Sequence, residues 1–86
     1  MSKYYDVMTF SYKGSTKESE MFCCFMETYS GMYNSLFDLT RFLMCSWGLF
    51  INLYEGYIME VCGEFTWYIK YEDEIVQKIV FTPHLD

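Results

Sequence analysis

Aromatic side chains dominate this chain: of its 86 residues, two are tryptophan, eight are phenylalanine and nine are tyrosine. A chain of this length forms one domain, and such a domain buries only roughly 60–65% of the surface that its unfolded form exposes. Each buried ring removes about 150–250 Å² from water, so even half of these rings would fill much of a small core. We therefore expect a single compact domain over residues 1–86.

The N-terminal third changes from a period of two to a helical period. Residues 4–12 alternate between two sets of apolar side chains, which predicts a strand. Ser15 and Glu18 then have the spacing of a capping box at the start of a helix. A stripe of large apolar side chains follows at helical spacing: Met21, Phe22, Phe25, Met26 and Tyr29. We predict a first helix over about 16–29 and expect Gly31 to close it, because glycine tolerates the left-handed conformation.

A second helix is predicted to begin at Asn34 or Ser35, because either side chain can cap it and Asp38 then lies in its first turn. Apolar residues at helical spacing mark its buried face: Leu36, Leu39, Leu43 and Trp47, with Phe42 and Phe50 beside them. We expect this helix to stop at Gly48. The segment 49–54 could extend the helix or begin a strand, and we favour a strand.

From Tyr57 onward the period of two returns, and breaks at 63–64 and 72–74 separate three strands, over 57–62, 65–71 and 75–82. Alternate residues would present one apolar face to the helices: Phe65, Trp67, Ile69, Tyr71, Ile75, Ile79 and Phe81. Pro83 lacks a backbone donor and should end the last strand. The predicted fold is α+β, with two helices packed on one face of a small antiparallel sheet in the order β-α-α-β-β-β. The first strand is expected to join that sheet, and the sheet could contain one further strand.

Few residues suit catalysis or metal binding. His84, the single histidine, is expected in a solvated tail that cannot hold a general base rigidly. The four cysteines lack the paired spacing of zinc sites and are interpreted as reduced, buried apolar side chains: Cys23, Cys24, Cys45 and Cys62. A Gly-rich phosphate loop is absent from the sequence. We predict that the protein is not an enzyme and binds no metal or cofactor. A rigid cleft that holds a buried pair of carboxylates would instead favour an enzyme.

Acidic residues are concentrated in the second half of the chain. Residues 1–41 hold five carboxylates against four basic side chains, and residues 42–86 hold seven against Lys70 and Lys78. A negative field repels nucleic acid and anionic membranes and attracts basic surfaces, so we expect a basic protein partner, with no direct nucleic-acid or membrane binding. The first six residues lack the apolar core of a signal peptide, which together with reduced thiols favours the cytoplasm.

Carboxylates of the C-terminal strands, together with a tyrosine, are the candidate partner-binding residues: Glu55, Glu60, Glu64, Tyr68, Glu72, Asp73 and Glu74. Tyrosine is enriched among the residues that dominate interface energy. Two other readings stay open. The acids could serve solubility alone, and the tyrosines could be half-buried rings with wet hydroxyls.

The first functional hypothesis is an inhibitor that mimics nucleic acid and occupies the basic nucleic-acid-binding surface of a partner enzyme. Same-face residues on a strand repeat every ~6.6 Å, whereas duplex phosphates advance ~3.4 Å, so tyrosine contacts would have to add affinity. In shortness, acidity and lack of known motifs the chain resembles small phage-encoded anti-defence proteins, including CRISPR inhibitors. That general resemblance implies action in a host-cell cytoplasm. The alternative is a structural or adaptor subunit that forms a homodimer or hetero-complex through exposed tyrosines.

Overall fold

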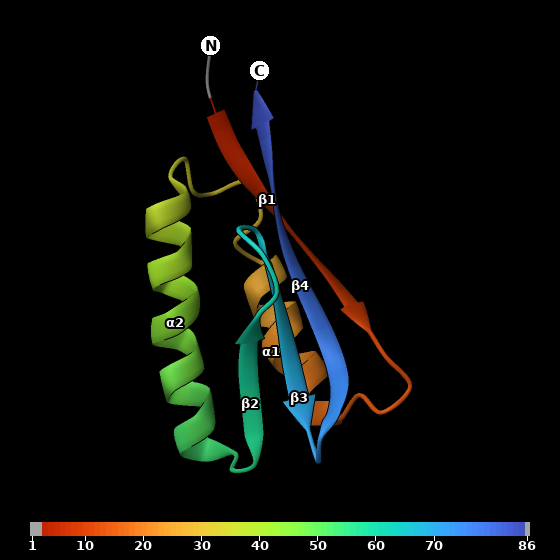
Figure 1. Ribbon diagram of the computed structural model, residues 1–86. Coiled ribbons are helices and arrows are strands. Elements are labelled where there is room, and N and C mark those ends of the chain that lie inside the picture. Colours follow the sequence, from red (N-terminus) through yellow and green to blue (C-terminus); the bar gives the residue numbers. More distant parts are fainter. Residues whose placement is uncertain (1–2, 86) are drawn as a thin grey trace.

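The computed structural model describes residues 3–85, in which two helices lie against a four-stranded antiparallel sheet (Figure 1). The elements in chain order are β1 (Lys3–Ser11), α1 (Lys17–Glu27), α2 (Leu36–Leu53), β2 (Tyr57–Val61), β3 (Thr66–Tyr71) and β4 (Glu74–Leu85). The predicted α+β class and the predicted order of elements are confirmed. Within residues 3–85 there is no further strand.

The strands are ordered β1-β4-β3-β2, so the first and last strands of the chain are neighbours. β4 is the longest strand and pairs with β1 on one side and β3 on the other. β2, β3 and β4 form the predicted meander. The prediction that the first strand joins this sheet is confirmed, and the structure places it at the edge beside β4.

One face of the sheet carries the core. The buried side chains of the strands come mostly from alternate positions: Tyr5, Val7, Tyr57, Trp67, Ile69, Ile79 and Phe81. The helices add Phe22, Cys23, Met26, Leu39, Leu43, Trp47 and Phe50. Met8 and Phe10, which point to the opposite face, are exposed. Both helices therefore cover the same face, and the other face is open to solvent.

The start of α1 lies one residue beyond the predicted position. Its N-cap is Thr16, whose hydroxyl accepts from the amide of Ser19, while the Ser19 hydroxyl accepts from the amide of Thr16, both at 3.0 Å. This reciprocal pair is a capping box, as predicted, but it replaces the expected Ser15–Glu18 pair. The carboxylate of Glu18 is thereby left out of the box.

α1 is also shorter than predicted. It ends at Glu27, and residues 28–31 form turns. Gly31 has φ +80°, as expected of a left-handed residue, but its amide donates to the carbonyl oxygen of Tyr5 at 2.7 Å. Gly31 thus attaches the connection between the helices to β1 instead of closing α1.

α2 begins at Ser35, its N-cap, which is one of the two predicted positions. It continues through Gly48, so the predicted strand over 49–54 is wrong. A glycine inside a helix costs about 1 kcal/mol relative to alanine. Burial of Phe50, whose ring lies 5.2 Å from that of Trp47, contributes about 1.5–3 kcal/mol and exceeds this cost.

β4 departs from the predicted alternation at a bulge. Ile69 pairs with Gln77 and Lys70 pairs with Ile75, which leaves Val76 as an extra residue. Val76 and Gln77 are both buried, whereas Ile75, which was expected to be buried, is exposed. The bulge therefore buries Val76 in place of Ile75, whereas Ile79 and Phe81 beyond it are buried as predicted.

Pro83 does not end the last strand. β4 runs on to Leu85, with Pro83 opposite Tyr5 of β1. The amide of Phe81 donates to the carbonyl oxygen of Phe65, on the β3 side, at 2.8 Å. Two residues later the nitrogen of Pro83 faces the same side, beyond the end of β3, so its missing proton costs no ladder hydrogen bond.

Candidate partner-binding surface

Four of the predicted binding carboxylates lie at one end of the sheet. Tyr57 of β2 pairs with Tyr71 of β3, so Glu55, just before β2, and Glu72, just after β3, are at the same end. The turn into β4 is completed by 73–74. Figure 1 shows this end at the bottom, where α2 leads into β2 and β3 turns into β4.

The start of α1 brings two further acids to this end. A hydrogen bond joins the hydroxyl of Thr16, the N-cap of α1, to that of Tyr57, the first residue of β2. It holds the first turn of α1, which carries Glu18 and Glu20, beside the same end of the sheet. These two carboxylates were not among the predicted binding residues, because no pattern in the sequence tells at which end of the sheet α1 begins.

We define the acidic end as Glu18, Glu20, Glu55, Glu72, Asp73 and Glu74. Two lysines, Lys13 and Lys17, lie in and just after the adjoining connection from β1 to α1. Six negative charges against two positive ones leave a formal charge of −4 here. The two ion pairs found within residues 3–85 lie elsewhere, so the carboxylates of the acidic end keep their field.

The other three predicted binding residues lie away from the acidic end. Glu60 forms an ion pair with Lys70 at 3.3 Å on the open face of the sheet. Glu64 lies in the turn between β2 and β3, at the opposite end of the sheet (Figure 1). Tyr68 lies between the two ends on the open face, with its ring edge to that of Tyr12 at 6.3 Å.

The turn between β3 and β4 is strained. Glu72 and Asp73 have φ 52° and 66°, and they form a two-residue connection between the paired Tyr71 and Glu74. Such a turn favours Asn-Gly, because the left-handed conformation costs roughly 1–2 kcal/mol for most residues with a side chain. Two carboxylates thus occupy positions where other residues would give greater stability, as is common at functional sites.

A groove of about 300 Å³ runs between α1 and α2, and its walls are almost wholly apolar. Its floor contains the buried rings of Phe22 and Phe50, whose centroids are 5.2 Å apart. Its walls are largely open to solvent, with exposed fractions of 50% for Met21, 43% for Phe25, 70% for Leu49 and 74% for Leu53. Contiguous exposed apolar surface of this kind marks binding sites.

The predicted buried stripe of α1 is therefore only half right. Phe22 and Met26 are buried, but Met21 and Phe25 line the groove. Two smaller residues face the sheet in their place, Ser19 and Cys23. The hydroxyl of Ser19 is hydrogen-bonded to a buried side chain of β4, so this side of the helix lies against the sheet.

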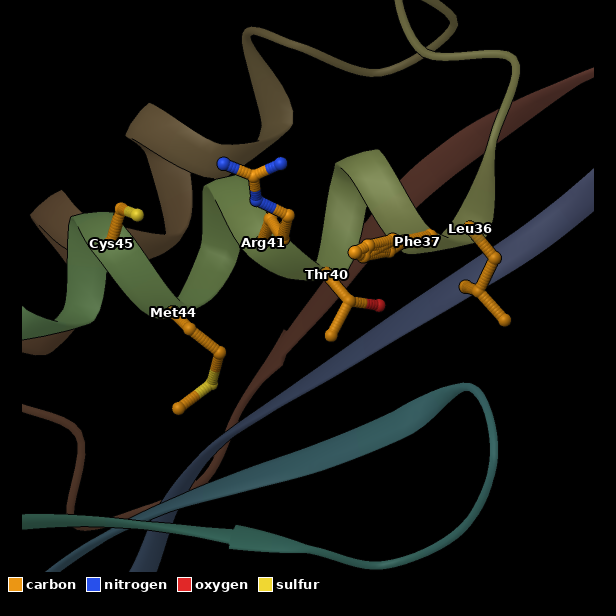
Figure 2. A pocket seen from close by; sticks show the side chains of 6 residues that line it. All are labelled: Leu36, Phe37, Thr40, Arg41, Met44 and Cys45. Atoms are coloured by element: carbon orange, nitrogen blue, oxygen red, sulfur yellow. The ribbon is translucent and has the colours of Figure 1, made fainter.

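α2 is apolar on its outer flank as well as towards the core. A shallow hollow of about 490 Å³ is lined by Leu36, Phe37, Thr40, Arg41, Met44 and Cys45 (Figure 2). Figure 2 shows side chains pointing to opposite sides of the helix around it, Met44 to one and Arg41 to the other. By length and composition the 18 residues of α2, with mean hydropathy 1.2, could also cross a membrane. Core helices of soluble proteins meet the same criterion, so the cytoplasmic and no-membrane expectations stay predictions.

His84 lies in β4 rather than in a solvated tail. Its Nε2 is 2.7 Å from the carboxylate of Asp6, and the ring of Tyr4 stacks on it at 5.3 Å. The hydroxyl of Ser30 donates to the same carboxylate at 3.2 Å. The serine is thus bonded to the aspartate instead of the imidazole, so His84 does not take the place of the base in a Ser-His-Asp triad.

The cysteines are free thiols, but only Cys23 is buried as expected; Cys24, Cys45 and Cys62 are exposed. Burial raises the pKa of the Cys23 thiol from 9.0 to about 12. Within residues 3–85 no group of three or more His, Cys, Asp or Glu side chains is placed to hold a metal ion.

Thiol reactivity should separate these cysteines. In the folded protein at pH 8, the three exposed thiols are expected to react with a disulfide reagent, and Cys23 only after unfolding, because the thiolate is the reactive form. Because the pKa of Cys23 is raised by folding, the unfolded state loses this proton first, and stability should fall as pH rises above about 9. A Cys23→Ala variant should lack that part of the decline. Four equally reactive thiols would contradict the burial.

No family model, curated protein or solved structure matches this chain.

Proposed function

We propose that this protein is a binding inhibitor that docks its acidic end on a basic, nucleic-acid-binding surface of a partner protein. One observation carries the proposal: six carboxylates from three separate segments converge at one end, with a formal charge of −4 and no ion pair among them within the described chain. A concentrated field of this sign speeds encounter with a basic groove and opposes binding to nucleic acid itself.

The shape of the acidic end supports docking into a groove. The two-residue turn of Glu72 and Asp73 is the narrowest projection that an antiparallel pair of strands can make. The acidic end would therefore mimic nucleic acid with a compact group of charges, and not with the row of carboxylates along a strand that the sequence suggested. Of the seven predicted binding residues, four belong to the acidic end, and the roles of Glu60, Glu64 and Tyr68 stay predictions.

The test is capture of basic nucleic-acid-binding proteins from a cell lysate by the tagged protein, followed by elution with duplex DNA. Capture at about 50 mM salt, release by DNA and loss at about 500 mM salt are expected, because exposed charges are screened at high ionic strength. Captured proteins that are not basic, or that DNA does not release, would overturn the proposal.

Two variants place the interaction at the turn. Reversal of Glu72, Asp73 and Glu74 to lysine should weaken capture about tenfold or more. A charge-matched comparison sets Glu72→Lys with Asp73→Lys against Glu27→Lys with Asp38→Lys, because Glu27 and Asp38 belong neither to the acidic end nor to the predicted binding residues. Equal effects of the two double variants would show that net charge matters and the acidic end does not.

A second variant separates binding from folding. Glu72→Asn with Asp73→Gly removes two charges but relieves the left-handed strain, so it should raise the free energy of unfolding by about 1–2 kcal/mol. Capture should nevertheless weaken. A more stable variant with unchanged capture would exclude these two carboxylates from the site.

A second candidate function is a subunit that associates mainly through apolar surface. It is favoured by the outer flank of α2, where Phe37 and Met44 are exposed. Such association should change little with salt, whereas docking by the acidic end should weaken steeply.

A further inference from the structure

We propose that the groove between α1 and α2 binds an amphipathic helix of the partner, whose apolar side chains fill the groove and whose Lys or Arg residues at one end meet the acidic end. This rests on the proposed function for the contact with the acidic end, and on separate observations for the groove.

The groove has the form that a helix can fill. Its floor is rigid, because it is made of buried rings packed on one another, Phe22 and Phe50. Its walls are flexible apolar side chains from both helices, with Met21 on one side and Leu49 and Leu53 on the other. Unbranched methionine adapts to different ligands, and helix-in-groove recognition uses apolar anchors on one face of the ligand. α1 has 11 residues and spans about 16 Å, so about three helical turns of a ligand would reach along it and a fourth would reach the acidic end.

The groove leads into the acidic end. One wall ends at Leu53 and Tyr54, and the next residue in the chain is Glu55. On the other wall, Glu18 lies one helical turn before Met21 and so on nearly the same line of α1. Apolar surface thus passes directly into uncompensated carboxylates, and a ligand that matches both must be apolar along one face and cationic at one end.

Charge also argues against a second copy of this chain as the occupant. Each copy carries a net charge of −6, so two copies joined through their grooves would repel each other. The helices offer little to offset this repulsion, since they contain two cations: Lys17, which precedes Glu18 of the acidic end, and Arg41, which lies by the other hollow. A basic partner meets no such repulsion.

The probe for this proposal is a synthetic amphipathic peptide of about 14 residues, with leucines on one helical face and lysines clustered at one end. It should bind the protein, and it should bind more tightly than a scrambled peptide of the same composition. Leu49→Gln with Leu53→Gln should weaken binding about tenfold or more, because two exposed anchors of the groove are lost. The control, Phe37→Gln with Met44→Gln, alters two exposed apolar residues by the other hollow and should leave the affinity unchanged.

The outcomes separate the two proposals. The groove site would be overturned if the helical and scrambled peptides bind equally well and the groove variant binds as tightly as the parent. If lysines at 72–74 still weaken that binding, the acidic end remains a binding site. Loss of binding in the groove variant with no effect of lysines at 72–74 would overturn the contact between the groove ligand and the acidic end. The proposed function fails separately, if the capture experiment yields no basic protein that DNA releases. Self-association in sedimentation, or binding to phosphatidylcholine vesicles, that the groove variant abolishes would show that a second copy or a lipid surface occupies the groove instead.

Discussion

Replacing Phe81 with alanine is expected to lower the free energy of unfolding by about 3–5 kcal/mol, because a buried ring is lost and the site cannot fully collapse. Phe81 lies in the central strand β4, opposite Val7 of β1, and its ring is 4.6 Å from that of Trp67 in β3. It therefore joins three strands, and its side chain is 1% exposed. The total free energy of unfolding of a small domain is about 5–15 kcal/mol, so this single substitution should remove a large part of the stability.

Urea denaturation followed by tryptophan fluorescence measures this loss. The control is Val80→Ala. Val80 precedes Phe81 and its side chain points to the open face, so the substitution should lower the free energy of unfolding by about 1 kcal/mol or less. A similar loss in both variants would contradict the placement of the core on one face of the sheet. The midpoint should shift while the slope stays constant, as expected for a change in stability alone.

The strands could be predicted from the sequence because their period of two is set by local geometry. The exception is instructive: after the turn, Ile75 is exposed and Val76 and Gln77 are both buried, because a bulge adds one residue to β4. A bulge shifts every later side chain relative to the turn, and no single residue here signals it. The correct prediction of Ile79 and Phe81 as buried came from the segment beyond the bulge.

The helices were harder to predict because the chain has more large apolar side chains than its core can hold. In α1, the apolar stripe at helical spacing included Met21 and Phe25, whose side chains are exposed, and it left out Ser19, whose side chain is buried. In α2, Gly48 suggested an end, but the packing of Phe50 against the sheet and α1 outweighs the cost of one glycine.

The candidate site was predictable in part for similar reasons. A charged break between two strands predicts an exposed turn, so the positions of 72–74 followed from the sequence. Glu55 lies just before β2 and Glu64 shortly after it, and an antiparallel hairpin sends them to opposite ends of the sheet. That Glu18 lies at the same end of the sheet as Glu55 is seen only in the structure, where a hydrogen bond joins Thr16 at the start of α1 to Tyr57 at the start of β2.

The rotation of α1, which leaves the groove open, is expected to depend on one buried polar side chain. Gln77 accepts a hydrogen bond from the hydroxyl of Ser19 at 3.0 Å, and its amide donates to the carbonyl oxygen of Phe10 at 3.3 Å and the hydroxyl of Ser11 at 3.1 Å. Gln77 and Ser19 are fully buried. This arrangement fastens the first turn of α1 to the sheet and turns its larger apolar side chains outward.

Gln77→Ala should therefore lower the free energy of unfolding by about 2–4 kcal/mol, since it leaves both a cavity and buried polar groups that lose a partner. Gln77→Leu keeps most of the volume and isolates the contribution of the hydrogen bonds, about 1–3 kcal/mol. If the bond to Ser19 sets the rotation of α1, the leucine variant should also expose the thiol of Cys23 to disulfide reagents and weaken binding of the amphipathic peptide. A leucine variant as stable as the parent, with Cys23 still protected, would show that packing alone orients the helix and that Gln77 has no part in shaping the groove.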